Sequence, residues 1–179
     1  MKKILYLHGK EGSVQGTKVR YIQSLNKYKT VCFPYDTGVG DQPWQDFIPG
    51  CIEKAKKWVQ GIEEVDGQEI QGERPDLIVA SSFGGGVLLS LIQSGDWQGD
   101  SIILAGAGIK YGLPATLPTG QKTVLIHGVE DEIISMLDSV VLGSSSEDAK
   151  VVLLKDGHRL YRILGETGIL AAEIDQLLS

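Results

Sequence analysis

The stretch Leu77-Ile-Val-Ala-Ser-Ser-Phe-Gly-Gly-Gly86 decides the fold class, because it has the pattern of a buried strand, a sharp turn and the start of a helix. Its small-x-Ser-x-Gly spacing is that of a turn that raises a serine hydroxyl above the edge of a sheet. The residues two before and two after such a serine crowd against each other, so both must be small. Ala80 and Gly84 meet this requirement around Ser82, and the pattern therefore predicts Ser82 as a nucleophile.

Two other interpretations of this stretch are weaker. Centring the motif on Ser81 would place Val79 and Phe83 at the crowded positions, and both side chains are too bulky. A glycine-rich turn before a helix can also bind phosphate, because helix N-termini attract anions. The stretch lacks both the G-x-G-x-x-G pattern and the Gly-Lys-[Ser/Thr] of a P-loop, and only Asp96 or Asp100 could hold a ribose. A nucleophile therefore remains the favoured interpretation.

Short apolar runs alternate along the chain with longer segments of helical periodicity. Runs that are apolar on both faces are typical of strands in a parallel sheet covered by helices on each side. The alternation predicts a three-layer α/β sandwich with a mainly parallel sheet and right-handed crossovers. The expected strands are Lys3–Leu7, Thr30–Phe33, Asp76–Ser81, Ser101–Ala105, Thr123–His127 and Lys150–Leu154. The expected helices are Lys18–Lys27, Trp44–Gln60, Phe83–Gln93, Asp131–Leu142 and Arg162–Leu178.

Two segments fit neither pattern. Gly61–Arg74 is polar and acidic, and we expect it to form a surface loop. Gly106–Gln121 is rich in glycine and proline and follows an expected strand. Long loops in compact domains are often functional, and ligands bind at the carboxyl edge of open α/β sheets. We therefore expect Gly106–Gln121 to lie near the functional site.

The composition excludes several classes of protein. The chain has 179 residues, which fits a single domain over residues 1–179. Its net charge of −6 offers no basic surface for nucleic acid or for an anionic membrane. No stretch approaches the roughly 20 apolar residues of a membrane helix, and Cys32 and Cys51 form no metal or redox motif. We expect a cytoplasmic protein that needs no metal or cofactor and binds neither nucleic acid nor membrane.

A nucleophilic serine needs a base, and only two histidines follow Ser82 in the chain. His158 comes directly after the last expected strand and before the last expected helix, so it should lie at the carboxyl edge of the sheet. His127 also ends a strand, but its pairing with Gly128 is more typical of a residue that shapes a turn. We therefore predict His158 as the base.

In enzymes whose nucleophilic serine lies on a turn of this kind, the chain order is serine, acid, histidine. The acid that orients His158 should therefore follow the strand before the last one. Three carboxylates are available there, in Glu130–Glu132, and the spacing Gly128-x-x-Asp131-x-x-Ile134 favours Asp131. Asp131 could instead cap the following helix. Asp156 is a weaker alternative, because it precedes His158 by only two residues. We predict Asp131 as the acid.

An oxyanion hole requires two preorganised N–H donors. One should be the backbone N–H of Phe83, directly after the nucleophile. The second should come from the loop after the first strand, Leu7–Ser13, where we predict the backbone N–H of Lys10.

Together, and in this order, these motifs resemble the α/β-hydrolase superfamily, and within it the small lidless bacterial serine esterases of the YqiA-like group. Many members have glycine where Ala80 stands, and alanine is tolerated there. The residues that carry the resemblance are Tyr6–Gly9, Gly12, Ser13, Gly16, Lys18, Ala80–Gly86, His127–Asp131 and Gly157–Leu160.

The resemblance implies a sheet of about six strands, in the order 2-1-3-4-5-6 for the strands named above, without a cap domain. It also implies a serine hydrolase that cleaves small carboxylic esters or thioesters with short acyl chains through an acyl-enzyme on Ser82. We expect Tyr111, Leu113 and Leu117 to line the acyl side, and a small molecule as the partner. The alternative is a binding or interaction protein that keeps the scaffold without turnover, because fold does not determine function.

Overall fold

The computed structural model describes residues 1–10, 12–32, 34–35, 43–165 and 167–179. Within them, six strands form one sheet in the order β2-β1-β5-β6-β7-β8, and every neighbouring pair is parallel. Phe33, the expected end of the second strand, lies outside the described residues. The strands are β1 (Lys3–Leu7), β2 (Lys29–Cys32), β5 (Leu77–Ser81), β6 (Ser101–Leu104), β7 (Thr123–Gly128) and β8 (Ala149–Leu154).

The predicted strand order is confirmed, since these six strands in chain order are arranged 2-1-3-4-5-6. The four central strands are buried along almost their whole length, whereas the edge strands β2 and β8 are partly exposed. This burial explains why the central strands appear in the sequence as unbroken apolar runs.

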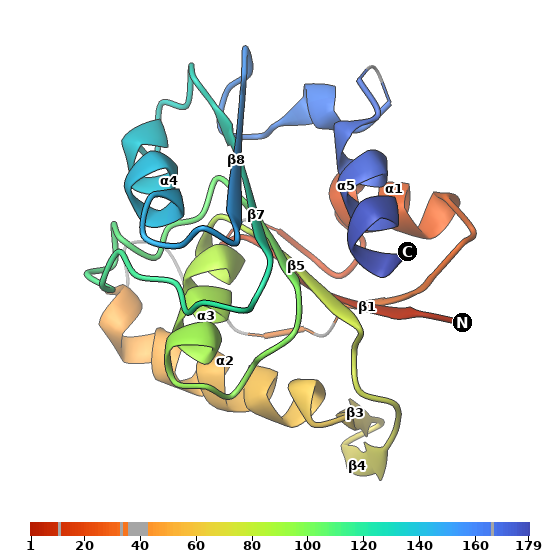
Figure 1. The fold of residues 1–179 in the computed structure, drawn as a ribbon. Helices are drawn as coiled ribbons and strands as arrows, with labels where there is room; N and C mark the ends of the chain where they lie inside the picture. Colours follow the sequence, from red (N-terminus) through yellow and green to blue (C-terminus); the bar gives the residue numbers. More distant parts are fainter. Residues whose placement is uncertain (11, 33, 36–42, 166) are drawn as a thin grey trace.

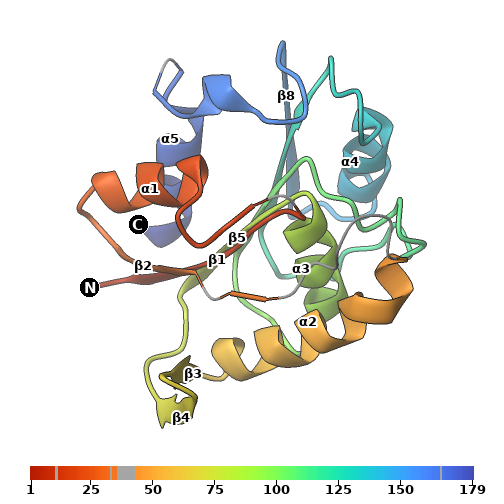
Figure 2. The same cartoon turned by 180° about the vertical axis from the view of Figure 1, so that it is seen from behind.

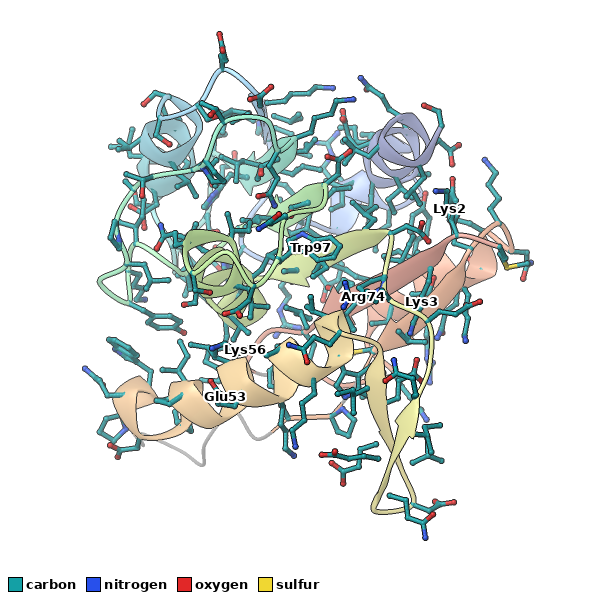
Figure 3. All side chains as sticks on the ribbon, turned by 60° about the horizontal axis from the view of Figure 1, so that its bottom comes forward. Lys2, Lys3, Glu53, Lys56, Arg74 and Trp97 are labelled. Carbon is teal, nitrogen blue, oxygen red and sulfur yellow. The ribbon has the colours of Figure 1, made fainter. Side chains whose placement is uncertain are left out.

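Helices cover both faces of the sheet (Figures 1 and 2). On one face lie α2 (Trp44–Val59), α3 (Phe83–Gln93) and α4 (Met136–Gly143). On the other lie α1 (Thr17–Ser24) and α5 (Ile169–Leu178). Figure 3 shows Lys56 on α2, where it pairs with Glu53 at 3.1 Å and with Asp96, beyond the end of α3, at 3.2 Å. The predicted three-layer α/β sandwich is thus confirmed.

Two of the expected helices begin later than predicted. The helix expected over Asp131–Leu142 begins only at Met136, after Ser135, whose Oγ accepts the N–H of Leu137. The helix expected over Arg162–Leu178 is divided into a 3-10 turn, η1 (Tyr161–Ile163), and α5, which starts after Gly168 at φ 63°. Apolar periodicity alone did not reveal these local starts, which leave residues 131–135 as a loop.

The segment Gly61–Arg74 is not a loop but an antiparallel hairpin of β3 (Ile62–Val65) and β4 (Gln68–Gln71). Its turn residues Asp66 and Gly67 both have positive φ, as a tight two-residue hairpin requires. The hairpin projects from the end of the molecule at which β1 begins (Figure 1). There the buried Lys3, labelled in Figure 3, bonds the Glu63 carboxylate and a backbone carbonyl. The hairpin therefore lies at the edge of the sheet opposite the carboxyl ends of the strands.

Candidate active site

Ser82 lies at the turn between β5 and α3 with φ 50° and ψ −113°. A non-glycine residue with positive φ is strained, and such strain persists only where the surrounding structure imposes it. Here the Ser82 N–H donates to Leu104 O at 2.9 Å, and the Ala107 N–H donates to Ser82 O at 3.0 Å. The neighbouring strand β6 and the loop after it therefore hold Ser82 in this conformation.

At Gly84, α3 approaches the end of β1 very closely. A Cβ atom on Gly84 would lie 2.2 Å from Leu7 O and 2.7 Å from His8 O. From the sequence, the residue at position 84 is expected to be small because it crowds against Ala80. The structure shows the end of β1 as the crowding neighbour, so a glycine here is what lets the first turn of α3 pack on the sheet.

Ser82, His158 and Asp131 form a continuous hydrogen-bonded chain. Ser82 Oγ lies 2.9 Å from His158 Nε2, and His158 Nδ1 lies 2.8 Å from Asp131 Oδ2. Because Asp131 is an acceptor, Nδ1 donates to it, and Nε2 is left to accept the Ser82 hydroxyl proton. The Asp131 side chain is fully buried and that of His158 is 13% exposed. The structure thus brings the three predicted residues together in the predicted order.

The Asp131 carboxylate is bonded on both of its oxygens. Oδ1 accepts the backbone N–H groups of Ile133 and Ile134, each at 2.8 Å, and Oδ2 accepts His158 Nδ1–H. Burial alone would raise the pKa of Asp131, but the hydrogen bonds from Ile134, His158 and Ile133 outweigh it and lower the pKa. Asp131 therefore remains ionised, and its backbone bonds lie in the loop before α4 rather than at the helix N-cap.

Asp156, the weaker candidate for the acid, has a different role. Its Oδ1 accepts the Gly157 N–H at 2.9 Å and its Oδ2 accepts the Arg162 N–H at 2.8 Å. Both bonds shape the loop that carries His158. Glu132 approaches the same loop, with its Oε2 3.4 Å from the backbone N of His158.

Lys18 on α1 also contacts the loop that carries His158. Its Nζ donates to Arg159 O at 2.7 Å. Burial lowers the pKa of Lys18 to about 8, and the neighbouring Asp156 and Arg159 charges act in opposite directions on it. A side chain of the first helix thus adds to the bonds that hold the His158 loop, 141 residues further along the chain.

The two predicted oxyanion donors belong to segments that meet at Ser82. Phe83 is the first residue of α3, and the first N–H groups of a helix have no acceptor within it. Gly9, in the loop after β1, lies close to Ser82, because a Cβ added to Gly9 would be 3.4 Å from Ser82 Cβ. His8 Nδ1 and the Gly12 N–H both bond Gly9 O, at 2.8 and 2.9 Å, and hold the turn that carries Lys10.

An aromatic cluster surrounds Phe83, whose side chain is fully buried. Its ring centroid lies 5.8 Å from that of Tyr35, 5.4 Å from that of Phe47 and 6.0 Å from that of Tyr111. Tyr111 is half-buried and also contacts the Trp44 ring, at 5.1 Å between centroids. This packing fixes the first turn of α3, and with it the direction of the Phe83 N–H.

The three residues expected on the acyl side lie at different distances along α3. Tyr111 contacts Gly86 in the first turn of the helix, where a Cβ would lie 3.0 Å from the Tyr111 ring. Leu113 lies further along α3. A Cβ added to Gly108 would be 3.5 Å from Leu113 Cδ1 and 2.6 Å from Cδ2 of Leu89 on α3. The loop then continues toward the end of α3, where Gln93 Nε2 bonds the carbonyls of Pro114 and Thr116.

The structure does not bring Leu117 to Ser82. Leu117 comes directly after Thr116, whose carbonyl is bonded by Gln93, the last residue of α3. Ser82 lies at the other end of the helix, directly before its first residue. An 11-residue helix is about 16 Å long. The Leu117 side chain is buried in the core, and its N–H donates to Ser145 Oγ at 2.9 Å. The expectation that Leu117 lines the acyl side was therefore wrong, because the loop returns to the opposite edge of the sheet.

His127 lies against Asp131, which its position in the sequence does not predict. It was expected to shape a turn, but its side chain is completely buried and its Nε2 lies 3.0 Å from Asp131 Oδ2. No sequence spacing signals this contact, because His127 lies in β7 and Asp131 in the loop that follows it.

In the described ranges, no three His, Cys, Asp or Glu side chains converge as a metal ion would require. None of the helices described is both long and apolar enough to cross a membrane.

Comparison with solved structures places this architecture among known folds. Alpha/beta hydrolase domain-containing protein 10 from mouse matches with a TM-score of 0.73 and 19% identity, over 98% of this chain and 89% of that chain. The 2-hydroxy-6-oxo-6-phenylhexa-2,4-dienoate hydrolase of a Rhodococcus strain matches with a TM-score of 0.70 and 13% identity, over 99% and 90%. MGS-MChE2, an alpha/beta hydrolase enzyme from a lagoon-sediment metagenome, matches with a TM-score of 0.66 and 14% identity, over 98% and 89%.

No protein-family model matches the sequence, and no curated protein matches it. The likeness to the solved structures is therefore one of fold, and it extends over nearly the whole chain. Together with the parallel six-stranded sheet and its strand order, it shows that the chain has the α/β-hydrolase fold.

Proposed function

We propose that this protein is a serine hydrolase that cleaves small carboxylic esters or thioesters with short acyl chains. The observation that carries the proposal is the unbroken chain from Ser82 Oγ through the His158 ring to the buried Asp131 carboxylate. The strained backbone of Ser82 supports it, since strain of this kind costs of order 1–3 kcal/mol and gathers at active sites. The resemblance to the YqiA-like esterases belongs to the same proposal.

Acylation begins when Ser82 Oγ attacks the carbonyl carbon of the substrate and His158 Nε2 takes the hydroxyl proton. Asp131 holds the ring in the tautomer that leaves Nε2 free and stabilises the imidazolium that forms. The N–H groups of Phe83 and Lys10 donate to the developing oxyanion. As the tetrahedral intermediate collapses, the leaving alcohol or thiol receives its proton from His158 Nε2, and the acyl group remains on Ser82.

Deacylation repeats these steps with water as the nucleophile. His158 Nε2 takes a proton from the water as its oxygen attacks the acyl carbon, and the same two N–H groups hold the second oxyanion. The proton then returns to Ser82 Oγ as the carboxylic acid leaves. Each step uses only this chain's own groups, the substrate and water, so the proposed chemistry calls for no cofactor.

A fluorophosphonate probe tests this proposal directly, because it reacts only with an activated serine. We expect the folded protein to take up one phosphonyl group, found on Ser82 by intact mass and peptide mapping. The same protein unfolded in urea, with the same serines but no base beside them, is the control and should stay unmodified. A folded protein that takes up no phosphonyl group would be the inactive binding protein of the alternative interpretation.

Tyr111 is proposed to limit the length of the acyl chain, because its half-buried ring packs beside Phe83 and Gly86 at the start of α3. We expect Tyr111→Ala to open space for longer acyl chains. A hexanoyl ester has two more methylenes than a butanoyl ester, and burying each contributes about 0.8 kcal/mol. The ratio of kcat/KM for the hexanoyl ester to that for the butanoyl ester should therefore be about tenfold higher in the variant than in wild type. The ratio is measured with p-nitrophenyl esters.

Leu117→Ala is the matched control for this prediction. It removes a buried apolar side chain from the same loop, at the far end of α3, and should lower the melting temperature without changing the hexanoyl-to-butanoyl ratio. An unchanged ratio in Tyr111→Ala would show that the acyl chain lies elsewhere.

A further inference from the structure

The edge of the sheet at β8 carries a surface of exposed apolar side chains. It consists of five residues that are each at least 36% exposed: Val151 and Leu153 on β8, and Leu137, Val140 and Val141 on α4. The two elements are in contact, since a Cβ added to Gly143 at the end of α4 would lie 2.2 Å from Val151 Cγ2. Figure 1 shows α4 beside β8 at this edge. A continuous exposed apolar surface is typical of an interaction site.

The backbone of β8 is open on the side away from β7. Among the described residues, β8 is the last strand of its sheet and pairs with β7 alone. Leu154 O accepts the Val129 N–H of β7 at 2.9 Å, so the even-numbered residues of β8 direct their backbone groups toward β7. Because these groups alternate in direction along a strand, those of Val151 and Leu153 point outward. An apolar edge of this kind is a template for another strand.

The two faces of β8 limit what that strand can be. Val151 and Leu153 lie on the face covered by α4. Lys150 and Val152 lie on the face covered by α5, where Lys150 Nζ pairs with Glu173 at 2.6 Å. A strand added here must place apolar side chains beside α4 and tolerate a lysine, already paired, on the other face. A second β8 meets both requirements, because it has the same alternation.

The charges at the two ends of β8 complement each other when two copies run antiparallel. With Val151 opposite Val151 of the second copy, Glu147 before the strand lies opposite Lys155 after it, and the reverse contact repeats this pair. Both side chains are exposed and can meet across the junction. Opposite charges on facing strands stabilise their pairing. The strand is therefore complementary to itself in charge as well as in its apolar face.

The neighbouring registers are less favourable. Because alternate residues point outward, the pairing can change only in steps of two residues. A step in one direction sets Lys150 opposite the same lysine of the second copy. A step in the other direction sets Asp148 opposite Asp156. Each step opposes like charges, which destabilises strand pairing, so the register centred on Val151 is favoured.

We propose that two copies of this chain associate through β8, antiparallel and with two-fold symmetry, so that their six-stranded sheets form one continuous sheet. The two-fold axis is perpendicular to the sheet, so both α4 helices lie on one face and their apolar side chains face each other across the junction. A six-residue strand is about 20 Å long. With α4 beside it, each copy buries on the order of several hundred Å², as in the smaller specific interfaces. This inference does not depend on the proposed function.

Sedimentation velocity over concentrations from about 1 to 200 µM tests the proposal. We expect wild type to form a species of twice the 19.4 kDa chain mass, with a dissociation constant of about 10 µM. Val151→Lys sets two like charges directly opposite each other and should raise this constant at least about tenfold. Val65→Lys is the matched control. It changes an exposed valine of the hairpin strand β3, away from the β8 edge, and should dimerise as wild type does.

Charge reversal at the ends of β8 tests the register. Glu147→Lys and Lys155→Glu each replace both expected ion pairs by like-charge pairs, and each should raise the dissociation constant about fivefold at low salt. The double variant exchanges the two charges and should return the constant to within about twofold of wild type. Both side chains are exposed, so these variants should fold even if Val151→Lys does not. Circular dichroism checks the folding of every variant.

The outcomes decide the proposal. A wild-type protein that stays monomeric at about 200 µM would overturn it, as would a dimer whose stability is unchanged in folded Val151→Lys, since that dimer must form elsewhere. A double charge variant that stays as weak as the single variants would overturn the antiparallel register. A monomer that binds phosphatidylcholine vesicles through the same apolar side chains would also overturn it, because the surface would then face lipid rather than a second copy.

Discussion

Ser82→Ala should lower kcat for a short-chain acyl ester by about 10⁶-fold, which is the typical result of removing the nucleophile of a catalytic triad. The side chain donates to His158 Nε2 and occupies the point at which the turn, the predicted base and the predicted N–H donors converge. Alanine keeps the small Cβ, so the fold should be retained. The measurement is kcat for p-nitrophenyl butanoate, with circular dichroism as the check on folding.

Ser81→Ala is the matched control, since it removes a hydroxyl from the neighbouring residue of the same chain. Ser81 ends β5, and its side chain hydrogen-bonds Tyr6 on the next strand rather than the His158 ring. We expect kcat to stay within about threefold of wild type, in keeping with the small net worth of one hydrogen bond. Activity that survives in Ser82→Ala but is lost in Ser81→Ala would reverse the assignment of the nucleophile.

Gly84→Ala should destabilise the protein by about 4 kcal/mol, which is at the high end for a single substitution. Its Cβ would lie 2.2 Å from Leu7 O and 2.6 Å from Leu7 C, and both atoms belong to the backbone of a buried central strand. Neither can move aside as a flexible side chain would, so α3 must shift away from the sheet. We expect the melting temperature to fall by roughly 10 °C or more for a domain of this size.

Gly50→Ala is the control for this prediction and should act in the opposite direction. Gly50 lies exposed within α2, and a Cβ added to it has nothing within 4 Å. Alanine in an exposed helix interior stabilises by roughly 0.5–1 kcal/mol relative to glycine. If Gly84→Ala melts at the same temperature as Gly50→Ala, the close approach of α3 to β1 does not constrain this fold.

Much of the sheet could be predicted from the sequence because its signals are local. The central strands are buried on both faces, so each appears as an unbroken apolar run, and the turn around Ser82 must be made of small residues. The hairpin β3–β4 was also signalled locally, by Asp66-Gly67 between two short polar strands. It was missed because those strands are exposed and lack the apolar alternation by which strands are usually found.

The loop that carries Asp131 was harder to predict, because its conformation depends on distant contacts. Apolar residues continue from Ile133 into α4, so periodicity alone favours a longer helix. In the fold, Asp131 Oδ1 takes the N–H groups of Ile133 and Ile134, and the helix starts only at Met136. The Asp131 bonds thus hold the residues before the helix as a loop, and the helix begins after Ser135, whose Oγ accepts the Leu137 N–H.

The sequence by itself determined the α/β fold class and the turn around Ser82, because buried strands and a crowded turn leave local signals, and the order of its motifs along the chain selected the three residues that meet there. The strand order followed from the resemblance to a known family rather than from any local signal. Only the tertiary structure decided what surrounds these three residues. It placed Leu117 at the far end of α3, made the end of β1 the reason for Gly84, and brought His127 onto the same carboxylate oxygen as His158. Such contacts form only when the strands and helices pack together, so no periodic pattern in the sequence predicts them.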